Sequence, residues 1–162
     1  MSESPIAAVQ VACSPFSELS VVTLHDLLRL RSDIFVVEQK CIYADIDGAD
    51  ALADTLHVIG YDDERIVAAA RVLGLASQGS ADDPVRIGRV VVHPDYRRRG
   101  LARAILLRCL DEIRNRRPGA VVMLSAQVVA VSLYEGVGFE CVSGPYDEDG
   151  IEHIDMRLDL GA

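Results

Sequence analysis

The sequence lacks the marks of several common classes of protein. Its four cysteines lie far apart and form no CxxC pair, which argues against a zinc knuckle or a redox motif. No run approaches the roughly 18 apolar residues of a membrane-spanning helix, so we expect no membrane partner. The first fifteen residues have no basic segment ahead of an apolar one. We therefore expect no signal peptide and a cytoplasmic location, where the thiols stay reduced. A catalytic cysteine–histidine pair is an alternative that spacing alone leaves open.

Positive charge is also scarce. The 162 residues include 16 Lys and Arg against 25 Asp and Glu, a net charge of -9. Nucleic-acid binding needs a basic face, so we expect no nucleic acid as partner. The acidic balance instead suits a cationic substrate. The four histidines are scattered, which argues against a metal site. We find no repeat and no linker, and we expect one domain over residues 1–162 with a core at about 6–160.

Hydrophobic periodicity predicts a mixed α/β sheet in the order β-α-β-β-β-α-β-α-β-β. One helix is expected over about 24–37, begun by Thr23 and Asp26 at capping-box spacing. A second begins near Gly100 and ends at Pro118, and a short third covers 128–137. The expected strands are 6–13, 56–61, 65–74, 85–92, 120–126, 139–144 and 151–158.

Three consecutive arginines and a glycine stand just before the second helix, in the segment RRRGLA at 97–102. A helix N-terminus presents unpaired N–H groups and the positive end of the helix dipole, which together bind anions. Gly100 lets the backbone approach a phosphate closely, and the arginines add charge. Neither a Walker loop nor GxGxxG is present. The pattern favours a diphosphate ligand, and the alternative is an ordinary solvated turn.

Arg97-x-x-Gly100-x-Ala102, between a strand and a helix, resembles the acetyl-CoA motif Q/R-x-x-G-x-G/A of the Gcn5-related N-acetyltransferases (GNAT). SLYEGVGFE at 132–140 resembles the family's later L-Y-x-x-x-G-F segment. RSDIFVVEQKCIYADIDGAD at 31–50 and YDEDGIEHIDM at 146–156 extend the resemblance, over nearly the whole chain, to the ElaA-like branch. The resemblance implies the GNAT acyl-CoA N-acyltransferase fold. In that fold a central, mostly antiparallel sheet has a V-shaped splay and is flanked by helices.

The resemblance further implies an N-acetyltransferase. Such an enzyme moves acetyl from acetyl-CoA to a primary amine, which attacks the thioester directly in a ternary complex without a metal. The acceptor amine is a small molecule or a protein, and a homodimer through sheet edges is possible in this fold. The alternative is a catalytically inactive module of the same fold that binds or senses acyl-CoA.

Residues that contact acetyl-CoA also follow from the resemblance. Backbone groups at the end of the central strand should bond the pantetheine arm and the thioester carbonyl, and the N–H groups of the next loop should hold the pyrophosphate. Side chains of Arg97 and Arg98 should meet the phosphates. Gln127 stands near the place where most of the family has Asn. The complete set is Val90, Val91, Val92, Arg97, Arg98, Arg99, Gly100, Leu101, Ala102 and Gln127.

The catalytic candidates are one tyrosine that the resemblance implies and three possible bases chosen for their chemistry. Tyr134 matches the family's general acid near the sulfur, and the alternative is a tyrosine that only packs. Glu38 is a candidate base because apolar neighbours would raise its pKa by burial, and the alternative is helix capping or a salt bridge. His153 and His57, on expected strands, are further candidate bases that could face the cleft. Two acidic segments either are solvated or flank the acceptor side: Asp45, Asp47, Asp50 and Asp54, and Asp147, Glu148 and Asp149.

Overall fold

The computed structural model describes residues 9–76 and 83–162. Within them the strands form an eight-stranded sheet in the order β1-β2-β3-β4-β5-β8-β6, and β7 pairs with β8. Only β4 and β5 are parallel, so the predicted mixed, mostly antiparallel sheet is confirmed. The strands are β1 (Val9–Pro15), β2 (Leu56–Asp62), β3 (Arg65–Leu73), β4 (Val85–Val92), β5 (Val121–Gln127), β6 (Glu140–Cys141), β7 (Tyr146–Glu148) and β8 (Ile151–Asp159).

Strand boundaries differ from the prediction at both ends of the chain. The first predicted strand starts at residues 6–8, which lie outside the described residues, and β1 continues two residues beyond the predicted end to Pro15. The predicted strand 139–144 is only two residues long, and part of the predicted turn after it is β7. Apolar residues are few in both segments, so pairing with β8 rather than local pattern decides their form.

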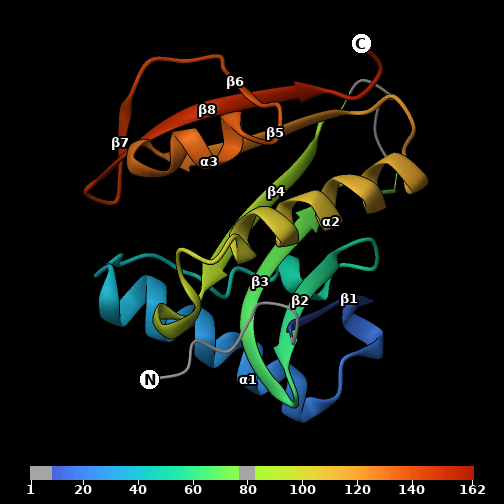
Figure 1. Cartoon of the computed structure of the whole chain (residues 1–162), viewed down its shortest axis with the longest axis vertical. Coiled ribbons are helices and arrows are strands. Elements are labelled where there is room, and N and C mark those ends of the chain that lie inside the picture. The colour runs from blue at the N-terminus through green and yellow to red at the C-terminus, as the bar shows by residue number, and fades with distance from the viewer. Residues whose placement is uncertain (1–8, 77–82) are drawn as a thin grey trace.

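Two helices cover opposite faces of the sheet (Figure 1). Helix α2 (Leu101–Arg116) buries Ile105, Leu106 and Leu110 against one face, as its periodicity predicts. Helix α1 (Val21–Arg31) packs Leu27 and Leu30 on the other face. Successive strand residues point to opposite faces, and so β4 sends its alternate side chains to different cores.

Helix α1 begins earlier than predicted and changes its winding. The side chain of Ser20, not Thr23, is the N-cap, and its Oγ accepts a hydrogen bond of 3.0 Å from the Thr23 N–H. After Arg31 the chain continues as a π-helical segment, Ser32–Glu38, in which the Gln39 N–H bonds the carbonyl of Ile34. The wider turn changes the direction in which the following side chains point, and such segments are frequent at functional sites.

The sheet opens between its two parallel strands. β4 and β5 pair only at Val85 with Val122 and at Arg86 with Met123. Beyond that point they diverge, as Figure 1 shows, so the predicted V-shaped splay is confirmed. A bulge shifts the β3–β4 register near Arg89, whose φ of 53° is left-handed. The second half of β4 therefore has an edge that β5 does not pair. No helix among the described residues is long and apolar enough to cross a membrane.

Candidate active site

A cavity of about 870 Å³ lies at the splay. Its walls come from the two diverging strands, the loop before α2, the short helix α3 (Val131–Glu135), the segment 35–43 and the β7–β8 turn. Val90, Val91 and Val92 of β4 line it, as the resemblance implies. Because β5 leaves this stretch of β4 unpaired, backbone N–H and C=O groups there are available to an extended ligand.

The loop before α2 has the geometry of an anion cradle. Arg98 and Gly100 both have left-handed backbone, with φ of 60° and 76°. A Cβ placed on Gly100 would meet no atom within 4 Å, so the space above the loop is open. The first N–H groups of α2 have no partner inside the helix and point toward this end. Arg98, Gly100, Leu101 and Ala102 line the cavity. These features fit a diphosphate.

The side chain of Arg97 is engaged elsewhere than predicted. Its guanidinium holds both Glu38 carboxylate oxygens, at 2.7 and 3.0 Å, and its Nε donates to the Val92 carbonyl at 3.1 Å. Its contact with a phosphate therefore stays a prediction. Arg99 does not line the cavity, and its guanidinium lies 5.8 Å from the centre of the Tyr96 ring.

Glu38 is not in the apolar setting that the sequence predicts. Its side chain is exposed, and the salt bridge to Arg97 is the alternative that the sequence left open. The carboxylate does not line the cavity. The π-helical segment explains the difference, since it ends at Glu38 and directs the following residue, Gln39, into the cavity instead. Gln39 in turn accepts a hydrogen bond of 2.9 Å from Gln127, which closes this end of the splay.

Tyr134 lines the cavity on α3 and is 8% exposed. Its ring packs edge-on against Phe139, with the centroids 6.3 Å apart. The hydroxyl forms no hydrogen bond with any group that the structure describes. Burial raises the pKa of Tyr134 to about 12, with a smaller effect from Cys109. The hydroxyl is thus protonated near neutral pH and has a proton to give.

His153 on β8 also lines the cavity. Its Nδ1 is 2.8 Å from the carbonyl oxygen of Ile151, and a carbonyl only accepts, so Nδ1 carries the hydrogen. In the neutral ring, Nε2 then has a free lone pair. That nitrogen is 3.6 Å from the Glu148 carboxylate, and the ring stacks on Tyr146. The arrangement suits a base that is stabilised once protonated.

His57 has a structural role. Its side chain is fully buried in β2, and its Nε2 lies 3.1 Å from the backbone carbonyl of Asp50. Burial lowers its pKa, so the ring is neutral and donates to that carbonyl. The expectation that His57 faces the cleft is wrong, because the cavity wall does not include it.

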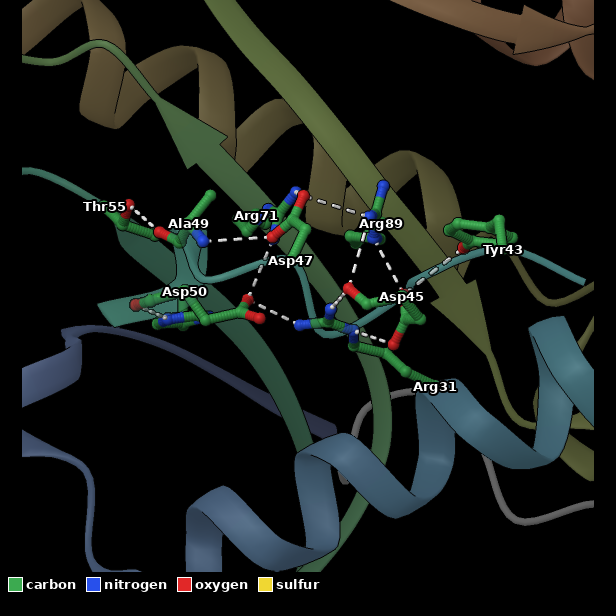
Figure 2. Close-up of polar contacts among 10 residues, drawn as sticks. Arg31, Tyr43, Asp45, Asp47, Ala49, Asp50, Thr55, Arg71 and Arg89 are labelled. Carbon is green, nitrogen blue, oxygen red and sulfur yellow. Dashed lines mark hydrogen bonds and ion pairs between the residues drawn. The ribbon is translucent and has the colours of Figure 1, made fainter. Parts of the chain in front are cut away.

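The first acidic segment is a buried ion network, which neither sequence interpretation anticipated (Figure 2). Asp45 and Asp50 are buried, and Arg31 bridges them at 3.0 and 2.6 Å. Arg71 holds Asp47 at 2.8 Å and Asp50 at 3.2 Å. The carboxylates of Asp45, Asp47 and Asp50 are therefore neither solvated surface groups nor available to attract a cationic acceptor. Asp54 is half-buried, and its carboxylate accepts a hydrogen bond of 3.2 Å from the Ala76 N–H.

The second acidic segment divides. Glu148 and Asp149 line the cavity, whereas Asp147 is exposed and caps the turn by accepting from the Gly150 N–H at 3.2 Å. Sequence reasoning missed other wall residues, notably Tyr43, Arg86, Arg89 and Ser125. The alternation of polar and apolar residues along the strands could have indicated Arg86 and Ser125, which are polar between apolar neighbours. Tyr43 and Arg89 carry none, because a loop and a bulge place them.

An open sheet with an unpaired central edge, a glycine cradle at a helix N-terminus and a buried tyrosine defines an acyl-CoA-dependent transferase of the GNAT type. The family model described as an acetyltransferase (GNAT) domain matches residues 35–160. The chain belongs to that family. Among the described residues, no group of three or more His, Cys, Asp or Glu side chains is placed to hold a metal ion.

Relatives confirm the ElaA-like resemblance. Protein ElaA of Escherichia coli is 42% identical over 146 residues, which cover 89% of this chain and 92% of ElaA. The crystal structure of E. coli ElaA superposes with a TM-score of 0.85 at 37% identity, over 92% of this chain and 98% of that chain. An acyl-CoA N-acyltransferase from Pseudomonas aeruginosa gives a TM-score of 0.84 at 36% identity, with the same coverage. A UPF0039 protein of Schizosaccharomyces pombe is 40% identical over 90% of this chain and 93% of its own length.

Proposed function

We propose that this chain transfers the acetyl group of acetyl-CoA to a primary amine by direct attack within a ternary complex. One observation carries the proposal: the unpaired edge of β4, the cradle at Gly100 and the protonated Tyr134 all meet in a single cavity. Membership of the GNAT family supports acyl transfer in general. The acetyl group and the amine are the finer parts of the proposal.

The cavity has a place for each part of the cosubstrate. N–H groups of Arg98 to Ala102 hold the pyrophosphate, and the backbone of Val90 to Val92 bonds the pantetheine arm as a neighbouring strand would. An N–H group at the same edge polarises the thioester carbonyl. A bound thioester supplies the activated acyl group.

The chain's own residues move two protons. Nε2 of His153 takes a proton from the acceptor ammonium, and the neutral nitrogen then bonds the carbonyl carbon while the carbon–sulfur bond breaks. Tyr134 gives its hydroxyl proton to the departing thiolate, and the resulting phenolate takes the second proton from the attacking nitrogen as the amide forms. The products are an amide and a free thiol, and solvent carries away the proton from His153. Glu148 stabilises the imidazolium across 3.6 Å.

We prefer His153 to the other candidate bases on position. Glu38 is held by Arg97 outside the cavity wall, and His57 is buried against Asp50. His153→Gln should therefore lower kcat/KM by about 100-fold or more, the usual contribution of a general base, and leave the Tm rise with acetyl-CoA intact. A wild-type kcat/KM in this variant would return the role to Glu38 or to water.

Two measurements test the proposal. Acetyl-CoA at a hundred times its Kd should stabilise the fold by about 2.7 kcal/mol, which raises the Tm by roughly 5–10 °C at this size. Release of free thiol with a panel of primary amines then tests turnover. A Tm rise with amine-dependent thiol release is the expected result. A rise without any turnover would favour the inactive acyl-CoA-binding module, and no rise at millimolar acetyl-CoA would reject both.

A further inference from the structure

The sheet face opposite α2 forms the acceptor wall of the cavity. On β4, Val85 and Ile87 belong to the α2 core, so Arg86 and Gly88 point to the opposite face. On β5, Ser125 lies on that same face, since its neighbours point toward α2. We call this wall the open face; its cavity-lining members are Arg71, Arg86, Gly88, Met123, Ser125 and His153.

Two arginines of the cavity wall, Arg71 and Arg89, are balanced by neighbouring aspartates. Arg71 is neutralised by Asp47 and Asp50. Arg89, which also lines the cavity, is neutralised by Asp45 at 2.8 Å and Asp47 at 3.3 Å. With Arg31, the network contains three arginines and three aspartates, and their charges cancel. None of this positive charge is left over for a ligand.

Arg86 differs from those arginines. It is exposed, it lines the cavity at the closed end of the splay, and it makes no hydrogen bond or ion pair with any residue that the structure describes. Beside it, a Cβ on Gly88 would meet no atom within 4 Å, although the backbone there is ordinary. An unpartnered guanidinium therefore borders an empty stretch of the cavity wall.

Negative charge gathers at the other end of the open face. Glu148 lies 3.6 Å from Nε2 of His153 and 3.4 Å from the hydroxyl of Ser125, and Asp149 also lines the cavity. An ammonium group is attracted to this end, where the proposed base lies. Arg86 pairs with Met123 and His153 pairs with Gln127, so the two ends are offset by four positions of β5, which is about 13 Å of strand.

We infer that the acceptor is an ω-amino carboxylate: its amine lies at Glu148 and His153, and its carboxylate meets Arg86 several bonds away. The inference rests on the proposed function, since it names the acceptor class of the same site. Planar guanidinium matches carboxylate with two parallel hydrogen bonds, which makes Arg86 a specificity-determining residue. Gly88 leaves the methylene chain room to pass.

Three amines of equal length test this assignment: 6-aminohexanoate, hexylamine and 1,6-diaminohexane. They differ only in the far group, which is an anion, a methyl or a cation. The wild type should show a kcat/KM for 6-aminohexanoate at least about tenfold above that for hexylamine, as expected for a charge-assisted hydrogen bond. 1,6-Diaminohexane should be the poorest of the three.

Two variants locate the effect. Arg86→Gln should bring the ratio of 6-aminohexanoate to hexylamine toward one, and Arg86→Glu should make 1,6-diaminohexane the best acceptor. Arg114→Gln, an exposed arginine on α2 paired with Asp111, is the matched control and should keep the wild-type ratio. Equal rates for the three amines, or a preference that survives Arg86→Glu, would overturn the inference and leave acetyl transfer standing. Thiol release with none of the three, despite a Tm rise with acetyl-CoA, would also overturn it.

Discussion

Tyr134 shows how burial adapts one side chain to a task. A tyrosine that is 8% exposed cannot ionise easily, because the phenolate would lose its hydration. Its pKa of about 12 keeps the hydroxyl protonated at neutral pH, so that it can donate a hydrogen bond, and then its proton, to the sulfur as the thiolate departs. Phe139 holds the ring at the cavity edge without using the hydroxyl. The environment thus leaves the Tyr134 hydroxyl available as a proton donor, because no structural hydrogen bond occupies it.

Tyr134→Phe should lower kcat by roughly 100-fold or more, which is the usual contribution of a general acid. The Tm shift caused by acetyl-CoA should persist, since the ring and its packing remain. Steady-state kinetics and melting curves check both parts. Tyr61→Phe, which changes a tyrosine outside the cavity wall, serves as control and should leave kcat within twofold. A Tyr134 variant with wild-type turnover would remove this residue from the mechanism.

Single residues were predictable where a motif fixes both their type and their place. Tyr134 and Gly100 belong to segments whose resemblance also supplies the surrounding fold. Glu38 and His57 were chosen for their chemistry alone, and three-dimensional neighbours decided their roles: Arg97 comes 59 residues after Glu38, and Asp50 closes over His57 from a loop. The residues next to Glu38 and His57 in the sequence do not indicate that Arg97 and Asp50 will be their partners.

At the scale of elements, helix α2 provides a matched pair of glycines. Gly100 precedes its first turn with φ of 76°, and Gly119 follows its last turn with φ of 75°. Both would place a Cβ in open space. A substitution at either position therefore brings a similar left-handed strain, about 1 kcal/mol. Only Gly100 lies beside the cavity.

Gly100→Glu should abolish the Tm rise caused by acetyl-CoA, because the new carboxylate repels phosphate and fills the cradle. Gly119→Glu should lower the Tm of the free protein by a similar amount yet keep the full rise with ligand. Melting curves with and without acetyl-CoA test both variants. If the two variants responded alike to the ligand, the cradle would have no specific role.

The hydrophobic periodicity of the sequence predicted which segments are helices and which are strands, but it did not predict where the backbone is irregular. The periodic face of α2 and the end at Pro118 are as predicted. The Ser20 cap was not foreseen although it is local, and neither was the π-helical segment. A bulge in the central strand was expected, but only through family resemblance. The splay was expected only through family resemblance. These irregular parts are what direct Gln39, Arg89 and Val90 to the cavity.

At the scale of the whole molecule, the ion network joins three parts of the chain. Arg31 comes from α1, Arg71 and Arg89 come from the sheet, and the aspartates come from the loop between them (Figure 2). The loop has little regular structure, so these pairs fix it against the sheet. Composition revealed the acidic segment, but its arginine partners lie up to 44 residues away and were not predictable from spacing.

The network makes stability depend on acid pH. Hydrogen bonds from Arg71 hold the pKa of Asp47 well below its usual range. At Asp50, burial favours the neutral form, but Arg31 and Arg71 together outweigh it and lower the pKa. A carboxylate whose pKa is depressed by folding contributes stability above its unfolded pKa of about 3.9, and loses it as pH falls below that value. Both groups therefore stabilise the fold fully at neutral pH.

Asp47→Asn should destabilise the protein by about 1 kcal/mol at pH 7, a modest value because its side chain is partly exposed to screening water. The difference from wild type should begin to shrink as pH falls below about 4, because the unfolded chain then binds a proton that folded Asp47 does not, and it should vanish only below the depressed pKa of the folded carboxyl. Urea unfolding at several pH values measures it. Asp33→Asn, in an exposed pair with Arg29 at 3.8 Å, is the control and should change stability little at any pH. A loss for Asp47→Asn that is equal at pH 7 and pH 3 would mean that Asp47 acts through packing, and that the charge of the network does not hold the loop.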